Sequence, residues 1–423
     1  MKIEDVNKLR GILELLLEHE SRTNEAKPIR YWYPLSLATY GTDEILEALH
    51  SMCSFRTSMA EKTLNFERAF ARWQGAADAV MVNSGSSADL LLALLLTDPR
   101  NPLLAPGDEV LVPIVTWPTQ VWSLMMAGLK VKFVDVDPST LNIDLEDLEH
   151  SIGPETRALS LVHLMGNPCD MDRIKALAKK HKLRLVEDCC EAMGATWDGK
   201  KVGNFSLGGA FSFFFSHHIT SMEGGMVAVS DLGHAEQLRI LRAHGWVRDV
   251  DKSRFRLHEY PGIDPRYAFV NWGLNVRPTD VQAGFGMQQL LKADGFAKRR
   301  HEFAGRIRKL IDESGWLSMP KVLPKAMPSW LAIPIMVAAN APFTKQELCD
   351  YLEGQGIETR PIVTGNIARH PVAELFPGAF RARGFPGADQ VHDRGFYIGL
   401  SPLQTDANVD RLIETFDQFL RRY

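Results

Sequence analysis

Between residues 64 and 245 the sequence alternates short apolar runs with helical stretches, and this alternation restricts the possible folds more than any other feature. Apolar runs typical of strands span 79–82, 110–113, 131–134, 158–163, 183–186, 210–214 and 226–229. Helical stretches alternate with them at 86–97, 118–128, 144–152, 170–181 and 233–243. Repeated strand–helix units predict an α/β fold with a largely parallel sheet and helices on both faces. Such sheets bind ligands at the carboxyl ends of their strands, so polar residues there are the candidates for a site.

The flanking segments predict two further parts of the chain. A helix is expected over 6–20, and its apolar face is made of Leu9, Ile12, Leu13, Leu16 and Leu17. A long helix from Thr279 to about Lys298 precedes elements at 331–337, 344–355 and 406–420, which indicate a smaller α+β domain. Because 423 residues are too many for one small core, we expect two domains, preceded by an N-terminal extension, which gives three parts. They are an N-terminal helical extension at 1–45, a large ligand-binding domain at 46–298 and a small C-terminal domain at 299–423.

Composition argues against several classes of protein. The net charge of −4 provides no basic field for nucleic acid or anionic lipid. No apolar run reaches the roughly 20 residues of a membrane span, and the first residues lack the apolar core of a secretion signal. Five scattered cysteines suit a reducing compartment, so a cytoplasmic protein is expected.

A short polar loop after the first apolar run suggests an anion site. The loop is Asn83-Ser84-Gly85-Ser86-Ser87, and a helical stretch follows it. Backbone N–H groups and hydroxyls at a helix N-terminus bind phosphate, with Gly85 and Ser86 as the candidates. An ordinary serine cap is the alternative. Ser212, at the end of a later apolar run, can add another hydroxyl.

Acidic and aromatic side chains follow two other apolar runs. Asp188 and Glu191 come after 183–186, where a buried Asp can keep a ring nitrogen protonated, although an exposed acidic loop is equally consistent. Trp117 can stack on a planar ring or pack in the core. The adjacent Cys189 and Cys190 should point apart, so no metal site is expected.

Histidines and arginines complete the candidate residues. His217 follows Phe211-Ser212 and precedes Glu223-Gly224-Gly225, and imidazole is a good proton base near neutral pH. The segments around Asn275, Arg277 and Arg360 offer groups that bind carboxylate or phosphate, although each arginine could instead form a surface ion pair.

Taken together, these segments resemble the DegT/StrS family of pyridoxal-phosphate sugar enzymes, in order and spacing, from about residue 45 to 423. The family's cofactor segment reads F-S-x-x-x-x-K-x-x-x-x-x-E/D-G-G, and here the position of the cofactor-binding lysine is His217. Within the family the chain is most similar to sugar 3-dehydratases, which share S-H-H-I-x-x-M-E-G-G, R-A-H-G-W, N-V-R-P and R-P-I-V-T-G-N.

The resemblance implies a fold, a partner and residue roles. The fold is the aspartate-aminotransferase type (fold type I), in a homodimer with active sites at the subunit interface. The implied cofactor contacts are Trp117 on the ring, Asp188 at the ring nitrogen, Glu191 nearby, and Gly85, Ser86 and Ser212 at the phosphate, with Asn275 from the partner subunit. The implied catalytic base is His217, and the implied substrate or amino-donor contacts are His244, Arg277 and Arg360.

The implied activity is dehydration of a nucleotide-linked 4-keto-6-deoxy sugar at C3, as in O-antigen biosynthesis. L-glutamate converts pyridoxal phosphate to pyridoxamine phosphate, and ammonia is released at the end. The cofactor is expected to be non-covalent, because imidazole cannot replace the lysine amine. No iron–sulfur cluster is expected, since 226–300 contains no cysteine. A sugar aminotransferase and an inactive binding subunit are the alternatives.

Overall fold

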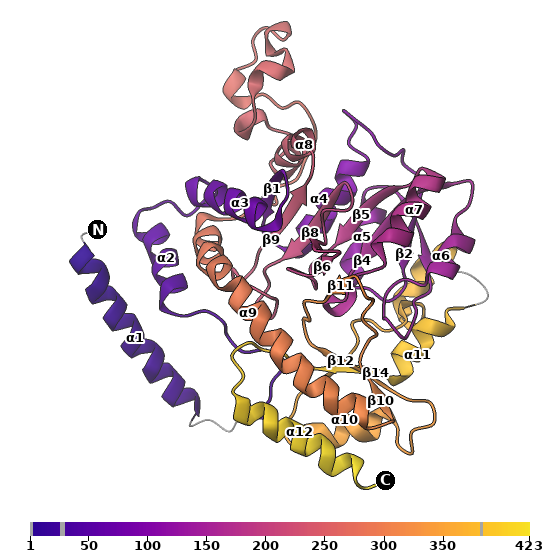
Figure 1. The fold of residues 1–423 in the computed structure, drawn as a ribbon. Helices are drawn as coiled ribbons and strands as arrows, with labels where there is room; N and C mark the ends of the chain where they lie inside the picture. Colours follow the sequence, from indigo (N-terminus) through magenta and orange to yellow (C-terminus); the bar gives the residue numbers. More distant parts are fainter. Residues whose placement is uncertain (1–2, 26–29, 381–383) are drawn as a thin grey trace.

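A seven-stranded sheet forms the centre of the large domain in the computed structural model, which describes residues 3–25, 30–380 and 384–423 (Figure 1). Its strands are β1 (Asp78–Val82), β2 (Glu109–Pro113), β3 (Lys130–Val134), β4 (Thr156–Val162), β5 (Arg184–Asp188), β8 (Gly208–Ser212) and β9 (Gly225–Val229). The strand order is β1-β9-β8-β5-β4-β2-β3. Only β9 runs antiparallel to its neighbours in this sheet, so the predicted, mostly parallel α/β architecture is confirmed.

Helices cover both faces of this sheet because alternate strand residues point to opposite sides. In β1, Val80 and Val82 pack with the α4 side, whereas Ala79 and Met81 pack with the aromatic cluster of α3. The helices of the domain are α3 (Glu61–Gln74), α4 (Gly85–Leu96), α5 (Pro118–Met126), α6 (Leu145–Ser151), α7 (Met171–His181) and α8 (Leu232–Arg242). The predicted helical stretches are therefore confirmed to within a few residues at each end.

The C-terminal domain has its own core. Its sheet has the order β10 (Leu317–Ser318), β12 (Ile333–Val337), β14 (Gly395–Ile398) and β13 (Thr359–Pro361), and it is antiparallel throughout. Its helices are α10 (Lys345–Gly354), α11 (Pro386–Arg394) and α12 (Asp406–Leu420). Tyr33 is fully buried in this core, and Trp32 donates a hydrogen bond to the carbonyl of Gln355 at 2.7 Å. Residues just after α1 thus pack on the far end of the chain.

Helix α9 (Asp280–Glu313) joins the two domains and is about four turns longer than the sequence indicates. Its second half is held by Phe303, Ala304, Ile307 and Ile311, which are buried in the C-terminal core. The expected boundary near residue 298 falls inside this continuous helix. The division into three parts stays a prediction.

The expected N-terminal helix is present as α1 (Ile3–Glu25), which lies beside α2 (Thr42–Cys53) at the edge of the molecule (Figure 1). An ion pair of 2.7 Å joins Arg10 to Asp43. The apolar stripe of α1 is only partly covered, since Ile12 and Leu16 are 56% and 54% exposed and its other members are half-buried.

The remaining described elements are short. They are a three-stranded sheet of β11 (Ala326–Met327), β6 (Thr196–Trp197) and β7 (Lys200–Lys201), and the 3₁₀ turns Leu164–Gly166, Val247–Asp249, Lys252–Phe255, Leu257–Glu259, Pro265–Tyr267, Ile367–Arg369, Pro371–Leu375 and Pro377–Ala379.

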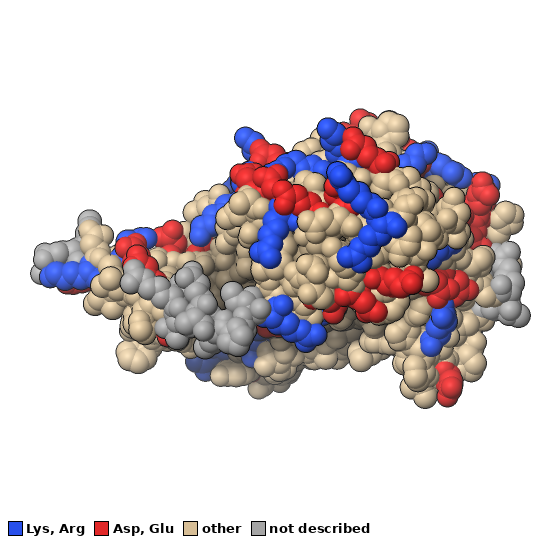
Figure 2. All heavy atoms as spheres, turned by 90° about the horizontal axis from the view of Figure 1, so that it is seen from below, with Lys and Arg blue, Asp and Glu red and all other residues tan. Residues whose placement is uncertain are grey.

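Charges of both signs are mixed on the face that Figure 2 shows, without a broad field of one sign. No helix in the described part of the chain is long and apolar enough to cross a membrane.

Candidate active site

The end of β1 leads directly into the N-terminus of α4, where the sequence predicts an anion site. Ser84 caps the helix, and its Oγ accepts a hydrogen bond from the backbone N–H of Ser87 at 3.1 Å. Gly85 begins the helix, and the exposed Ser86 places its Oγ 3.2 Å from Oγ1 of Thr119. The open N–H groups and the helix dipole favour a phosphate at this point.

Close backbone approaches bring Ser212 and the glycine motif to the same place. A Cβ on Gly85 would lie 2.5 Å from Cβ of Ser212 and 3.2 Å from Sγ of Cys190. A Cβ on Gly225 would lie 2.3 Å from the carbonyl oxygen of Ser84. Only glycine fits at either position without movement of the neighbouring backbone or side chains. The spacing of the motif therefore follows from the packing of β8 and β9 against the start of α4.

The two adjacent acids at the end of β5 face different surroundings. Glu187 is fully buried and accepts hydrogen bonds from the backbone of Gly203 at 2.7 Å and of Phe205 at 2.9 Å. Asp188 accepts one from the backbone of Cys190 at 2.9 Å, and burial raises the pKa of Asp188. No Lys or Arg of the described residues pairs with Asp188. A cation beside this carboxylate would offset the cost of burying it.

Trp117 caps α5 and is 57% exposed, so core packing does not account for this ring. Close by, the hydroxyl of Thr364 donates a hydrogen bond to the carbonyl of Thr116 at 3.0 Å. The contact ties a loop of the C-terminal domain to the strand end that carries Trp117. An exposed indole at such a place can stack on a planar ligand.

His217 lies in the loop between β8 and β9 and is half-buried. Its backbone N–H donates to the carbonyl of Phe214 at 3.0 Å, and the two rings meet edge to face at 5.9 Å. Burial lowers the pKa of His217 to about 4, against a raising effect of the Ser212 backbone and together with a lowering effect of Arg300. The imidazole is therefore uncharged near neutral pH and available as a base.

Glu191 connects the strand ends to the C-terminal domain. Its Oε2 accepts a hydrogen bond from the backbone of Met165 at 2.7 Å, and burial raises the pKa of Glu191 to about 7, with Asp188 adding to the shift. Glu191 in turn raises the pKa of Tyr397 after the larger effect of burial. Tyr397 pairs with Arg360 across β14 and β13.

Arg360 itself forms the surface ion pair that the sequence left open. Its guanidinium lies 2.7 Å from Glu358, and its side chain is about half exposed. A substrate group would have to compete with this partner.

The segments around His244 and Asn275 lie together. The backbone of His244 donates to the carbonyl of Leu274 at 2.8 Å, and the side chain of Asn275 accepts a hydrogen bond from Nε of Arg277 at 3.0 Å. The carbonyl of Val276 accepts from the backbone of Asn83 at 3.1 Å, just before α4. Within a single chain this group therefore lies next to its own anion site.

Two neighbours of the site, Asp89 and Arg300, are not among the residues that the sequence analysis predicts. The carboxylates of Asp89 and Asp188 and the thiol of Cys190 lie within 4.8 Å of one another. Asp89 stands one helical turn after Gly85, so its spacing could have revealed it. Arg300 lies beside His217 from the middle of α9, and nothing local in the sequence indicates this.

Cys189 lies in the aromatic cluster on the opposite side from Cys190, as expected.

The arrangement fits pyridoxal phosphate on three counts. The start of α4 and Ser212 suit its phosphate, the buried Asp188 suits a protonated ring nitrogen, and Trp117 offers a face for the ring. This combination of sheet, helix terminus and strand-end carboxylate defines a pyridoxal-phosphate enzyme of the aspartate-aminotransferase fold.

The chain belongs to the DegT/DnrJ/EryC1/StrS aminotransferase family, which matches residues 39–417. A GDP-4-keto-6-deoxy-D-mannose 3-dehydratase of Yersinia pseudotuberculosis is 34% identical over 383 residues, covering 90% of this chain and 97% of the relative. A dTDP-4-dehydro-2,6-dideoxy-D-glucose 3-dehydratase of Saccharopolyspora spinosa is 35% identical over 399 residues, covering 91% and 86%.

A solved structure gives the same picture. The E. coli GDP-4-keto-6-deoxy-D-mannose-3-dehydratase with bound hydrated PLP superposes with a TM-score of 0.85 at 33% identity, covering 91% of this chain and 99% of that chain. These relatives confirm the predicted family, the fold and the use of pyridoxal phosphate. The chain is thus a pyridoxal-phosphate-dependent sugar-modifying enzyme.

Proposed function

We propose that this chain is a 3-dehydratase that removes the C3 hydroxyl of a nucleotide-linked 4-keto-6-deoxy sugar, with glutamate as amino donor and ammonia as a product. The observation that carries the proposal is the half-buried imidazole of His217 at the position where the family pattern has lysine. Burial lowers its pKa to about 4, which favours the neutral form of the ring. Imidazole can take a proton but cannot hold the cofactor covalently. A lysine amine at this position could bind the cofactor covalently again and so favour transamination. Histidine removes that route and favours elimination of the C3 hydroxyl.

Bound as pyridoxamine phosphate, the cofactor supplies an amine for the sugar ketone and a ring that accepts electrons. Each candidate residue then has one task. The N–H groups at Gly85 and Ser86 and the hydroxyl of Ser212 bind the phosphate. Asp188 holds a proton on the ring nitrogen, and His217 takes the proton from C4′ of the cofactor.

The remaining candidates serve the substrates. Arg277, Arg360 and His244 carry groups that bind the glutamate carboxylate or the nucleotide phosphates. Arg360 exchanges its partner Glu358 for the ligand. We place the active site in a homodimer, with Asn275 supplied by the partner subunit.

The test is incubation of the protein with pyridoxal phosphate, glutamate and 4-keto-6-deoxy sugars linked to GDP or dTDP, followed by mass spectrometry of the sugar. Loss of the C3 oxygen with release of ammonia is expected. Replacement of the keto oxygen by an amine would instead identify an aminotransferase, which the family also contains by description. No change in any sugar, together with tight cofactor binding, would favour an inactive binding subunit.

A further inference from the structure

Arg300, on α9, is a buried cation that pairs with no acidic side chain among the described residues. Arg300 is only 4% exposed. The guanidinium donates to the backbone carbonyls of Leu331 at 2.8 Å, Trp330 at 3.5 Å and His217 at 3.4 Å. Its Nε has no hydrogen-bond partner among the described residues, and no carboxylate of that part of the chain pairs with it. A buried charge held only by carbonyls is costly, so a compensating role is expected.

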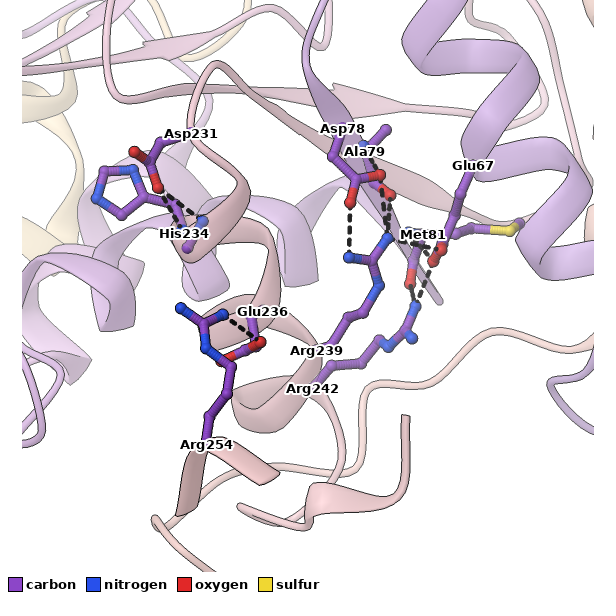
Figure 3. A network of polar contacts seen from close by, with 11 residues as sticks. Glu67, Asp78, Ala79, Met81, Asp231, His234, Glu236, Arg239, Arg242 and Arg254 are labelled. Atoms are coloured by element: carbon purple, nitrogen blue, oxygen red, sulfur yellow. Dashed lines mark hydrogen bonds and ion pairs between the residues drawn. The ribbon is translucent and has the colours of Figure 1, made fainter. Parts of the chain in front are cut away.

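The same chain supplies an acid to another arginine that is buried to the same degree. Arg242, at the end of α8, is 1% exposed and lies 2.6 Å from a carboxylate oxygen of Glu67 (Figure 3). It also donates to the carbonyl of Met81 at 2.8 Å, as Figure 3 shows. The fold can therefore provide an acid for a buried arginine. That none of the described acids pairs with Arg300 calls for an explanation in the surroundings of Arg300.

Arg300 lies next to two histidines, His217 and His218, with each of which it lines a cavity. Arg300 and His217 line one narrow cavity with Leu35, Ser36, Leu37, Thr39, Phe215, Ser216, Leu400 and Ser401, and none of these described residues is acidic. On its other side Arg300 lines a second small cavity with His218, Lys201 and Asp294. Asp294 accepts a hydrogen bond from the Trp73 indole at 3.0 Å.

A backbone carbonyl near Arg300 orients the ring of His218 and sets its tautomer. Nε2 of His218 lies 2.8 Å from the carbonyl of Ser329, so this nitrogen carries the hydrogen in the neutral ring. Nδ1 of His217 and Nδ1 of His218 are enclosed and have no partner among the described residues. Burial lowers the pKa of His218 to about 3, and Arg300 adds to that effect.

We propose that Arg300 is a positioning residue for His217, which anchors its backbone carbonyl and, as an unpaired positive charge, disfavours a second positive charge on either imidazole. The proposal deepens the proposed function, because it assumes that His217 is the base. The guanidinium then has two separable effects. Its hydrogen bonds orient the loop between β8 and β9, and its charge keeps the base in the neutral form.

Two substitutions separate these effects. Arg300→Gln keeps an N–H donor for the carbonyls but removes the charge, whereas Arg300→Lys keeps the charge and loses the planar fork. The readout is the titration of the imidazoles of the full-length protein by NMR, with and without pyridoxal phosphate, with signals assigned through His217→Asn and His218→Gln. In Arg300→Gln the titration of His217 should move upward by about one pH unit, and in Arg300→Lys by much less. The matched control is Arg308→Gln, because Arg308 also lies on α9 and is partly buried, but its guanidinium binds the carbonyl of Pro320 at 3.0 Å.

A His217 titration that is the same in Arg300→Gln as in the wild type, or that moves equally in Arg308→Gln, would overturn the proposal. These titrations need no sugar substrate, so they are independent of whether the chain is a dehydratase. In the activity assay, the acidic limb of the pH profile should move upward by about one pH unit in Arg300→Gln, while Arg300→Lys should lose rate at all pH values. If Arg300→Gln does not fold, a normal His217 titration in Arg300→Lys with a lower rate still supports the anchoring role, and an unchanged rate contradicts it.

Discussion

An imidazole that is half-buried beside a fixed positive charge binds a proton weakly, so it stays in the unprotonated form that the proposed base needs. Burial lowers the pKa of His217 to about 4, so the ring stays uncharged from mildly acidic pH upward. An exposed imidazole would be partly protonated near pH 6.5. The surroundings of His217 therefore make it a weaker base, but one that is unprotonated over a wide pH range. This suits a proton transfer from a carbon that the cofactor has already made more acidic.

Substitution of His217 should separate loss of the base from gain of a covalent anchor. His217→Asn should lower dehydration by at least ~100-fold, the lower end for a positioned base, without binding the cofactor covalently. His217→Lys should lose dehydration to a similar extent but hold the cofactor covalently, provided that burial lowers the pKa of the new amine. Borohydride treatment followed by protein mass measurement detects the covalent form.

The control for this prediction is His218→Gln, because His218 contacts Ser329 and not the cofactor region. It should keep most of the activity. Near-normal dehydration in His217→Asn would assign the base to another group, and a cofactor adduct on the wild-type chain would contradict the non-covalent site.

Asp188→Asn should keep the cofactor but lose most of the turnover. The amide fits the same space and cannot hold a proton on the ring nitrogen, so the electron sink weakens. Because burial raises the pKa of Asp188, the neutral amide should leave the melting temperature of the cofactor-free protein unchanged or higher. Steady-state rates at saturating cofactor and thermal unfolding measure the two effects. A rate within a few-fold of the wild type would mean that Asp188 is not the ring partner.

At the residue scale, the sequence identifies groups whose position follows from a strand end or a helix start. Gly85, Ser86 and Asp188 are of this kind, and the structure brings the regions of all three together. Arg300 could not be found this way, since its contact with His217 joins residues 83 positions apart through the packing of α9. The exposure of Trp117 also depends on tertiary packing, which the sequence alone left open.

At the element scale, the start of α4 depends on how closely β8 approaches it. Gly85→Ala would place a methyl group 2.5 Å from Cβ of Ser212, and so would push apart the two parts of the proposed phosphate site. We expect a loss of at least ~10-fold in pyridoxal phosphate affinity, about 1.4 kcal/mol. Fluorescence titration of the cofactor-free protein measures it.

The matched control is Gly295→Ala, inside α9, where a Cβ would meet no atom within 4 Å. This substitution should stabilise the helix by up to ~1 kcal/mol and leave cofactor binding unchanged. Normal cofactor affinity in Gly85→Ala would show that the phosphate is bound elsewhere.

The types of the elements were easier to predict than their ends. The strand–helix alternation predicted the large sheet, since each apolar run had to be buried by neighbouring helices. The run at 183–186 understates β5, because its last residues, Glu187 and Asp188, are polar but still paired in the sheet. The end expected near Lys298 is likewise too early, because buried residues beyond it continue α9 into the C-terminal core.

At the scale of the whole molecule, the half-buried His217 and the buried His218 should make stability depend on pH. His217 and His218 have depressed pKa values, about 4 and about 3, so their contribution to stability is present above the unfolded value of about 6.5 and is lost as pH falls. Glu191, with its pKa raised to about 7, has the opposite effect, because its contribution is lost as pH rises. Because these effects on stability oppose each other, the contribution of one histidine is measured by comparing the wild type with a variant that lacks it.

Between pH 6.5 and 4.5 the wild type should lose about 1.4 kcal/mol more per pH unit than His218→Gln, since one fewer proton is taken up on unfolding of the variant. Urea unfolding at the two pH values measures the difference. His258→Gln, at an exposed histidine, should behave as the wild type. Equal acid sensitivity of His218→Gln and the wild type would mean that His218 is protonated in the folded protein.

The assembly of the site across a homodimer is open to a direct test. In one chain, Asn275 is exposed and its segment lies beside Asn83, just before α4, so it could serve its own site or that of a partner. His217, by contrast, is held within its own chain by Phe214 and Arg300. If Asn275 and His217 of one active site come from different subunits, a mixed dimer of the two variants contains one intact site. If both come from the same subunit, every site of the mixed dimer carries a substitution.

We therefore predict that two inactive variants recover activity when their subunits exchange. His217→Asn lacks the base, and Asn275→Asp repels the phosphate by its charge. In a two-fold dimer, about half of the exchanged molecules are mixed, and each has one site with both native residues, so about a quarter of the wild-type rate is expected. Rates before and after exchange under mild denaturant measure this, with each variant treated alone as the control. Confirmed exchange without recovery would mean that Asn275 acts on the site of its own chain.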